Sequence, residues 1–135
     1  MEFMQQNAVY MFVGLVLAWF VWQRIIGPKM AGVKSIGATE YLKMRDQEHV
    51  LLDVRQQGEW VSGHAPAAIH IPLGELKQRM DEVAKDKPVI VICASGNRSS
   101  MAATALGNTG HHEVFNFSGG MSAWSGAGLP VKTGA

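Results

Sequence analysis

The chain has 135 residues, enough for one domain of ordinary size and too few for two catalytic domains. Its 12 Lys and Arg nearly balance 11 Asp and Glu, and a formal charge of +1 excludes the strongly basic surface that binds nucleic acid, so we expect no nucleic-acid partner. The single cysteine, Cys93, excludes an intramolecular disulfide framework and a multi-cysteine zinc site, and a lone thiol is typical of a reducing compartment.

The first element in chain order is an apolar segment near the N-terminus. Residues 8–22 carry no strongly polar side chain, and the longer stretch 4–26 is sufficient for a helix that crosses a hydrocarbon core of about 30 Å. Polar residues lie near its ends, and Trp19 and Trp22 fall where indole rings prefer a membrane interface. We predict a transmembrane helix over residues 4–26, which makes a lipid bilayer an expected partner.

Two other interpretations of this segment are a cleaved signal peptide and a buried core helix. A signal peptide fits less well, because the start carries Glu2 and no convincing small-residue cleavage site follows. A core helix fits less well because the rest of the chain accounts for a complete domain. We expect the helix to end at Gly27–Pro28, since proline lacks an amide donor and clashes with the preceding turn.

Charge around the segment predicts its orientation. Arg24, Lys29 and Lys34 follow it, and no Lys or Arg precedes it. The positive-inside rule therefore predicts a single-pass protein, expected in a bacterial inner membrane, with the C-terminal domain facing the cytoplasm. We expect residues 1–30 to form the anchor and a short linker, and residues 31–135 to form the domain.

The rest of the chain alternates short apolar runs with helical patterns. The runs predict strands at 49–54, 68–71, 89–92 and 113–117, with edge pieces at 35–36 and 130–131. The helical patterns cover 39–45, 73–83 and 99–106. This alternation predicts an α/β fold with a central, mostly parallel sheet flanked by helices. Ligands of such sheets bind beyond the carboxyl ends of the strands.

Cys93 ends the strongest predicted strand and is followed by a glycine-containing loop and a helix start. Gly96 allows a tight turn, and successive loop N–H groups at a helix start form an anion-binding nest. Arg98 adds a fixed positive charge, and such surroundings favour the nucleophilic thiolate. The expected substrate-binding residues are Ala94, Ser95, Gly96, Asn97, Arg98 and Ser99, with Ser100 as a further polar group.

A lone cysteine at a strand end is often only a small buried apolar residue. Here the glycine, the arginine and the following helix start all favour a reactive thiol. Cys93 is therefore the predicted catalytic nucleophile.

Several short motifs occur in a fixed order along the chain. They are Asp53-Val54-Arg55, Glu59-Trp60, Gly63-His64, Ile69–Pro72, Cys93–Ser99, Gly119–Met121, Ala123-Trp124 and Gly128–Pro130. In order and spacing they resemble the motifs of single-domain rhodaneses, a family of thiosulfate and persulfide sulfurtransferases. The resemblance covers about residues 35–132.

The resemblance implies a rhodanese-like α/β domain in which Cys93 carries a transferable sulfur atom as a persulfide and the loop 94–98 cradles it. It implies a small sulfane-sulfur donor such as thiosulfate or a persulfide, an acceptor that is a thiol, cyanide or a protein, and no metal or organic cofactor. Ala67-Ala68 and His70 depart from the family's usual residues, and we expect them to affect packing or local turns. Trp60 stands where Phe or Tyr is commoner and is expected to fill the core.

Loop length distinguishes two enzymatic hypotheses. From Cys93 to Arg98 the pattern is C-x4-R, whereas cysteine phosphatases and arsenate reductases that resemble this fold use C-x5-R. The shorter loop leaves room for one extra sulfur atom and little for a phosphoryl group, so sulfur transfer is favoured. A third hypothesis is a non-enzymatic, membrane-tethered binding module, against which the intact loop argues.

The remaining polar residues near these motifs favour structural roles. Asp53 and Arg55 end a strand, and an ion pair that braces the loop fits them better than catalysis, because a carboxylate would oppose the charge of a persulfide. His64 is expected to form a hydrogen bond with the backbone or with Glu59.

Two neighbouring histidines near the C-terminal end of the chain raise the question of a metal site. His111 and His112 lack a third ligand at a suitable spacing, and we interpret them as surface residues. Trp124 is expected to pack the last helix on the sheet.

Overall fold

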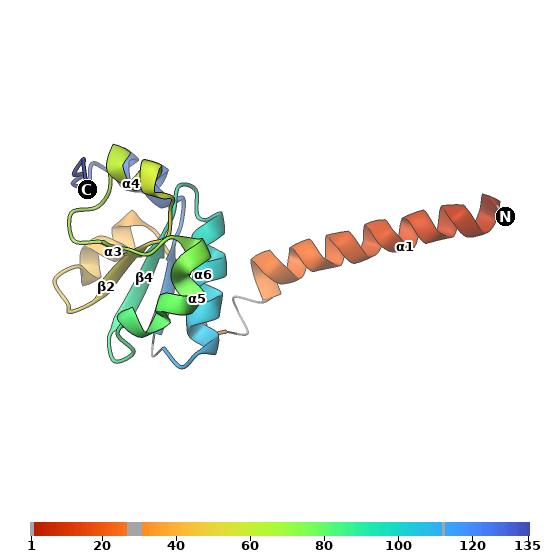
Figure 1. Ribbon diagram of the computed structural model, residues 1–135, viewed down its shortest axis with the longest axis horizontal. Helices are drawn as coiled ribbons and strands as arrows, with labels where there is room; N and C mark the ends of the chain where they lie inside the picture. Colours follow the sequence, from red (N-terminus) through yellow and green to blue (C-terminus); the bar gives the residue numbers. More distant parts are fainter. Residues whose placement is uncertain (1, 27–30, 112) are drawn as a thin grey trace.

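The computed structural model describes residues 2–26, 31–111 and 113–135. It consists of an α/β domain and one long helix, α1 (Glu2–Val21), that projects away from it (Figure 1). Helix α1 continues into a π-helical segment, η1 (Trp22–Ile26), which contacts helix α6 of the domain. The helix end predicted at Gly27–Pro28 lies outside the described residues.

Five strands form one parallel sheet in the order β1-β5-β4-β2-β3. They are β1 (Lys34–Ile36), β2 (Val50–Asp53), β3 (Ile69–His70), β4 (Pro88–Ile92) and β5 (Glu113–Phe117). The α/β prediction is confirmed. The edge strand expected at 130–131 is wrong: Pro130 has no amide hydrogen to donate, and pairing in this segment is an isolated bridge between Lys132 and His64.

Six helical segments connect or follow the strands. They are α3 (Ala38–Met44), α4 (Gln57–Ser62), α5 (Leu73–Arg79), η2 (Met80–Glu82), α6 (Asn97–Asn108) and α7 (Gly120–Gly126). The helix predicted over 73–83 is divided, because α5 is followed by the 3₁₀ turn η2. The sequence does not predict α4, whose six residues are too few to show a helical period.

The sheet is covered on both faces, as alternation of side chains along each strand requires. Val89 and Val91 of β4 face one side, where the core includes residues of α5 and α6. Ile90 and Ile92 face the other side, where the core includes residues of α3 and α7. Trp124 belongs to this second core and packs α7 on the sheet, as predicted.

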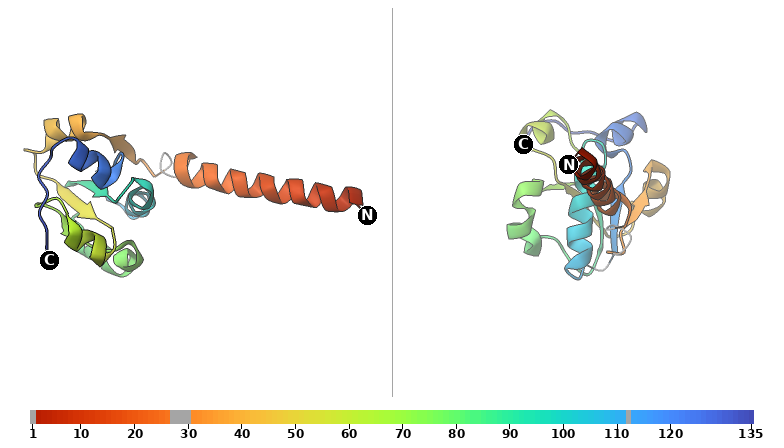
Figure 2. Two further views of the ribbon diagram at one scale, coloured as in Figure 1. Left: turned by 90° about the horizontal axis from the view of Figure 1, so that it is seen from above. Right: turned by 90° about the vertical axis from the view of Figure 1, so that its right-hand side faces the viewer.

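Helix α1 does not contribute to either core. Its side chains from residue 5 onward are exposed, and two further views show it pointing away from the sheet (Figure 2). Among the described residues, Gln5–Ile26 is the one helical stretch long and apolar enough to cross a membrane by length and composition.

Candidate active site

Cys93 lies directly after β4, at the carboxyl edge of the sheet. Its side chain is fully buried and points to the same face as Val89 and Val91, toward α6. Gly96 has a φ of +101°, a left-handed conformation that favours glycine, and it caps the start of α6. The strand, loop and helix predicted around the cysteine are therefore present, with the thiol inside the turn.

The sulfur of Cys93 is surrounded by hydrogen-bond donors. The Gly96 N–H donates to Sγ over 3.0 Å, and the Ser99 Oγ lies 3.3 Å from Sγ. Burial raises the pKa of the Cys93 thiol, but hydrogen bonds from the Ser99 hydroxyl and from the backbone of Ser99, Ser95 and Gly96 outweigh it, so the pKa is lowered overall. This environment favours the thiolate, which is the nucleophilic form of a cysteine.

The start of α7 holds the loop from the other side. The Met121 N–H donates to the Cys93 carbonyl oxygen over 2.7 Å, and the Ser122 N–H donates to that of Ala94 over 3.3 Å. Gly120 has a φ of +56°, and a Cβ at this position would collide with the Cys93 carbonyl oxygen. Only glycine allows this close approach of the two backbones.

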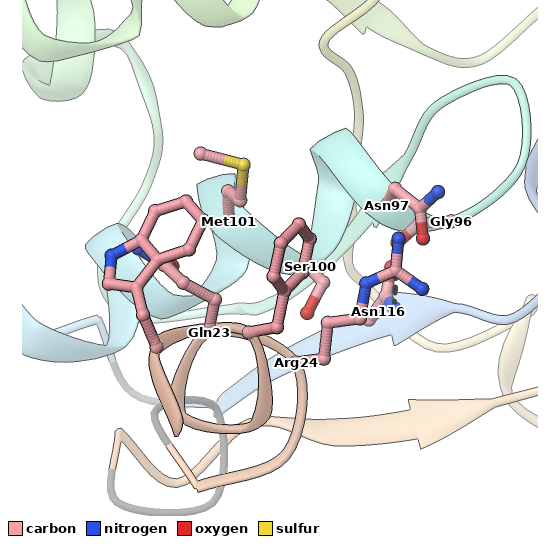
Figure 3. A pocket seen from close by; sticks show the side chains of 9 residues that line it. Gln23, Arg24, Gly96, Asn97, Ser100, Met101 and Asn116 are labelled. Carbon is pink, nitrogen blue, oxygen red and sulfur yellow. Dashed lines mark hydrogen bonds between the residues drawn. The ribbon is translucent and has the colours of Figure 1, made fainter. Parts of the chain in front are cut away.

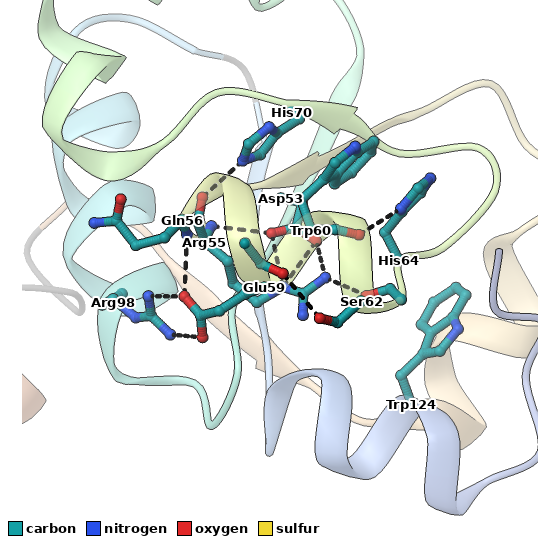
Figure 4. Close-up of polar contacts among 12 residues, drawn as sticks. Asp53, Arg55, Gln56, Glu59, Trp60, Ser62, His64, His70, Arg98 and Trp124 are labelled. Atoms are coloured by element: carbon teal, nitrogen blue, oxygen red, sulfur yellow. Dashed lines mark hydrogen bonds and ion pairs between the residues drawn. The ribbon is translucent and has the colours of Figure 1, made fainter. Parts of the chain in front are cut away.

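Arg98 is engaged in a two-pronged ion pair with Glu59 of α4 (Figure 4). Its Nη1 lies 2.6 Å from Glu59 Oε1 and its Nη2 2.8 Å from Oε2. The hydrogen bonds from Arg98 lower the pKa of Glu59 to about 2, and those to Glu59 raise the pKa of Arg98. The positive charge expected for a substrate anion is thus compensated within the protein, and the pair fastens α4 to the start of α6, directly after the cysteine loop.

Asp53 and Arg55 form the predicted ion pair at the end of β2. Arg55 Nη2 lies 2.8 Å from Asp53 Oδ2, and both side chains are buried. The same Nη2 donates to the Gly63 carbonyl oxygen over 2.6 Å, so Arg55 ties the end of β2 to the end of α4.

The Trp60 indole is stacked between two imidazoles, as Figure 4 shows. The centroid of the His64 ring lies 3.6 Å from that of the indole, and the centroid of the His70 ring lies 4.7 Å from it. Both imidazole planes are nearly parallel to the indole plane. His64 Nδ1 lies 2.8 Å from the Trp60 carbonyl oxygen and His70 Nε2 2.7 Å from that of Arg55. The predictions of a core role for Trp60 and a backbone partner for His64 are confirmed.

The prediction that His111 lies at the surface is wrong. Its side chain is buried, and its ring nitrogens lie 3.1 Å from the carbonyl oxygens of Leu106 and Val83. The imidazole fastens the end of α6 to the chain after η2, a contact between distant segments that the His-His pair itself does not reveal. His112 lies outside the described residues. In the described part of the chain, no group of three or more His, Cys, Asp or Glu is placed to hold a metal ion.

Asn116 of β5 is a site neighbour that sequence reasoning missed. Its Oδ1 lies 2.5 Å from Ser99 Oγ, and its Nδ2 donates to the Gly96 carbonyl oxygen over 3.3 Å. The sequence contains one indication of this role. Asn116 is a polar residue two positions after Val114, so it lies on the same face of the strand, the face that packs against α6.

A cavity of about 320 Å³ lies between the end of the N-terminal helix and α6 (Figure 3). Arg24 of η1 points into it toward the turn at Asn97 (Figure 3). The cavity adjoins the cysteine loop at Gly96. Its lining residues are Trp19, Phe20, Gln23, Arg24, Gly96, Asn97, Ser100, Met101 and Asn116. The predicted site residues Asn97 and Ser100 therefore face this cavity.

The fold and the loop define an α/β domain with a lone cysteine at the end of its central strand. Residues 37–127 match the family of Rhodanese-like domains. The chain belongs to the rhodanese family, which confirms the resemblance seen in its motifs.

Individual relatives agree with this assignment. The chain is 39% identical over 90 residues to a sulfurtransferase of Allochromatium vinosum, covering 66% of this chain and 84% of the relative. It is 35% identical over 115 residues to the uncharacterised protein YqhL of Bacillus subtilis, covering 85% of this chain and 86% of the relative. The crystal structure of a rhodanese-related protein from Thermoplasma volcanium superposes with a TM-score of 0.68 at 34% identity, covering 73% of this chain and 97% of that one.

Proposed function

We propose that the protein is a membrane-anchored sulfurtransferase that carries a sulfane sulfur as a persulfide on Cys93. The observation that carries the proposal is the buried Sγ at the end of β4, with the Gly96 N–H at 3.0 Å and the Ser99 hydroxyl at 3.3 Å. These donors favour a thiolate in a space enclosed by the loop. Membership of the rhodanese family supports the same chemistry.

In the first step the Cys93 thiolate attacks the outer sulfur of a donor such as thiosulfate. A bond forms between Sγ and that sulfur, and the bond from the outer sulfur to the sulfonate sulfur breaks. Sulfite leaves with the bonding electron pair, and the negative charge of the thiolate passes to the terminal sulfur of the persulfide. Backbone N–H groups of the loop 94–98 are suited to stabilise this charge, and no proton transfer is required.

In the second step a nucleophilic acceptor attacks the terminal sulfur. The acceptor is a thiol, cyanide or a protein, and Cys93 Sγ leaves as a thiolate, which restores the starting state. Such a double displacement is the usual kinetic pattern of covalent nucleophilic catalysis. Because Arg98 is paired with Glu59, we assign it mainly to holding the loop, and the donor anion is met chiefly by the backbone from Ala94 to Asn97.

We further propose that residues 1–30 form the anchor and linker, and that residues 31–135 form a domain facing the cytoplasm. Exposure of the apolar α1 side chains from residue 5 onward supports a lipid environment. Arg24, near the C-terminal end of the span, and Lys34, which follows it, support the cytoplasmic side. The anchor would keep the sulfur carrier close to the membrane surface.

The test of the activity is persulfide formation on the detergent-solubilised full chain. After incubation with thiosulfate, intact mass is expected to increase by one sulfur atom, and the Cys93→Ala variant is expected to show no increase. Addition of cyanide should then release thiocyanate and restore the original mass. Absence of an adduct with both thiosulfate and a persulfide donor would contradict the proposal and favour the binding module. Hydrolysis of a phosphate ester would instead favour the phosphatase.

A further inference from the structure

We propose that Asn116 is a positioning residue that, through the hydroxyl of Ser99, sets how readily Cys93 gives up its proton. The inference deepens the proposed function and rests on it only in taking Cys93 as the reacting thiol. Asn116 does not touch the sulfur, so its effect has to pass through Ser99.

The sheet register brings the three residues together. Asn116 of β5 is paired with Val91 of β4, two residues before Cys93, and residues two apart on a strand share a face. Ser99, in the first turn of α6, lies over this face. Its Oγ is 2.5 Å from Asn116 Oδ1 and 3.3 Å from Cys93 Sγ. Ser99 and Cys93 are both fully buried, so the contact between them forms inside the protein, whereas the contact of Ser99 with Asn116 is partly buried.

The orientation of the Asn116 amide follows from its second contact. Its other polar atom faces the Gly96 carbonyl oxygen at 3.3 Å, and a carbonyl oxygen only accepts hydrogen bonds. Nδ2 therefore lies on that side, and Oδ1 faces Ser99. Because Oδ1 has no hydrogen, the hydrogen in the short contact is the single hydroxyl hydrogen of Ser99.

This single hydrogen cannot serve Asn116 and a thiolate at once. With a neutral thiol, the Cys93 S–H can donate to Ser99 and the Ser99 hydroxyl to Asn116, so every acceptor is satisfied. After ionisation the sulfur has no hydrogen and becomes the stronger, charged acceptor. Turning the hydroxyl toward the sulfur then leaves the two oxygens of Ser99 and Asn116 at close range without a hydrogen between them.

Asn116 therefore stabilises the neutral thiol relative to the thiolate. The amide cannot escape by rotating through 180°, because its oxygen would then face the Gly96 carbonyl oxygen. The same competition arises in the second half of the proposed reaction, when Sγ leaves as a thiolate. Asn116 thus sets the balance between the neutral thiol of Cys93 and the thiolate that the Ser99 hydroxyl stabilises.

The experiment measures the alkylation rate of the only cysteine by iodoacetamide as a function of pH, on the full chain in detergent. It needs no sulfur donor. Asn116→Ala is expected to move the midpoint of the pH profile to lower pH, by about one unit for one hydrogen bond to a charged sulfur. Asn116→Val also lacks the acceptor and suits a strand, so it is the second variant to use if Asn116→Ala folds poorly. It should also move the midpoint to lower pH.

Ser99→Ala is the matched control, and it should move the midpoint to higher pH because the sulfur loses a donor. In the Ser99→Ala background, adding Asn116→Ala should not move the midpoint further, because the hydroxyl that links residue 116 to the sulfur is absent. An unchanged midpoint in both Asn116 variants, with or without a lower rate at every pH, overturns the inference and leaves Asn116 a purely structural role. So does a shift that persists without Ser99. Failure of the sulfurtransferase proposal is distinct, because it leaves these alkylation profiles intact while no persulfide forms.

Discussion

The ion pair of Glu59 and Arg98 joins two segments that are 39 residues apart in the chain. The sequence predicts a positive charge beside Cys93, but it does not show that a carboxylate from α4 meets it. Only the fold places α4 over the active loop. Because the charge of Arg98 is compensated by Glu59, binding of an anion depends mainly on the backbone N–H groups of the loop and less on the Arg98 side chain.

The pKa of Glu59, lowered from 4.5 to about 2 by Arg98, makes this pair a source of pH-dependent stability. A carboxylate whose pKa is lower in the folded state contributes stability above its unfolded pKa and loses it as pH falls toward the folded pKa. We expect Glu59→Gln to be less stable than the wild type at pH 7, by no more than about 1 kcal/mol because the pair is partly exposed.

The difference should fade between pH 4.5 and about 2, where Glu59 in the wild type becomes protonated. Urea unfolding of both proteins at a series of pH values measures it. If the difference in free energy of unfolding between the wild type and Glu59→Gln stayed constant down to about pH 2, the ion pair would not be its origin.

The buried pair of Asp53 and Arg55 is expected to respond more strongly to substitution than the partly exposed pair of Glu59 and Arg98. Asp53→Ala leaves the Arg55 guanidinium buried without its partner carboxylate, and such a loss costs about 3–5 kcal/mol. Denaturant unfolding is the measurement. Asp53→Asn is the matched control, because it keeps the shape and one oxygen acceptor and should lose less. Equal and small losses in both variants would contradict a structural role for the pair.

At the level of elements, the contact between the start of α7 and the cysteine loop can be tested by one methyl group. Gly120→Ala places a Cβ against the Cys93 carbonyl oxygen at a left-handed φ, which alone costs about 1–2 kcal/mol. We expect lower stability and slower alkylation of Cys93, because the loop must shift.

Gly126→Ala is the matched control in the same helix. Gly126 has no positive φ, and a Cβ there meets nothing within 4 Å. Thermal unfolding and the alkylation rate should be close to those of the wild type. If Gly120→Ala behaved like Gly126→Ala, the close approach of α7 to the loop would not matter for the thiol.

Elements with a strong local pattern could be predicted from the sequence, and those that depend on distant partners could not. The strand Glu113–Phe117 is found with its predicted ends, since apolar and β-branched residues mark it locally. Helix α4 is too short to show a period, and its position depends on the Arg55 contact to Gly63 and on Glu59 with Arg98. His111 is buried by α6 and the chain after η2, which no local pattern indicates.

The same division applies to the candidate site. Cys93, Gly96 and the start of the following helix are neighbours in sequence, and their turn could be predicted from that alone, although the helix begins at Asn97, two residues before the predicted start at Ser99. Asn116 comes from another strand, and only the register between β4 and β5 places it beside Ser99. Contacts that cross the sheet are set by tertiary structure, so a single sequence conveys them only as a polar residue in an unexpected place.

At the level of the whole molecule, the domain and the apolar helix are separated by few residues. Strand β1 begins at Lys34, whereas the apolar stretch ends at Ile26. If Gln5–Ile26 spans a bilayer, this short connection keeps the domain beside the membrane surface. We expect the full chain to require detergent for extraction from membranes, and a chain that begins at residue 31 to remain in solution without it. Extraction of the full chain by salt or alkali alone would contradict a spanning helix.

The orientation can be tested with a single reporter thiol. In a Cys93→Ala background, Lys43→Cys places a cysteine on the exposed side of α3. A membrane-impermeant maleimide should label it in inside-out vesicles and not in intact spheroplasts, because the positive residues after the span favour the cytoplasmic side. Moving charge to the other end, with Gln5→Lys and Gln6→Lys combined with Arg24→Gln, should make part of the population accessible in spheroplasts. Labelling of the Lys43→Cys protein in intact spheroplasts without these changes would place the domain outside the cytoplasm, where a lone reduced thiol would be hard to maintain.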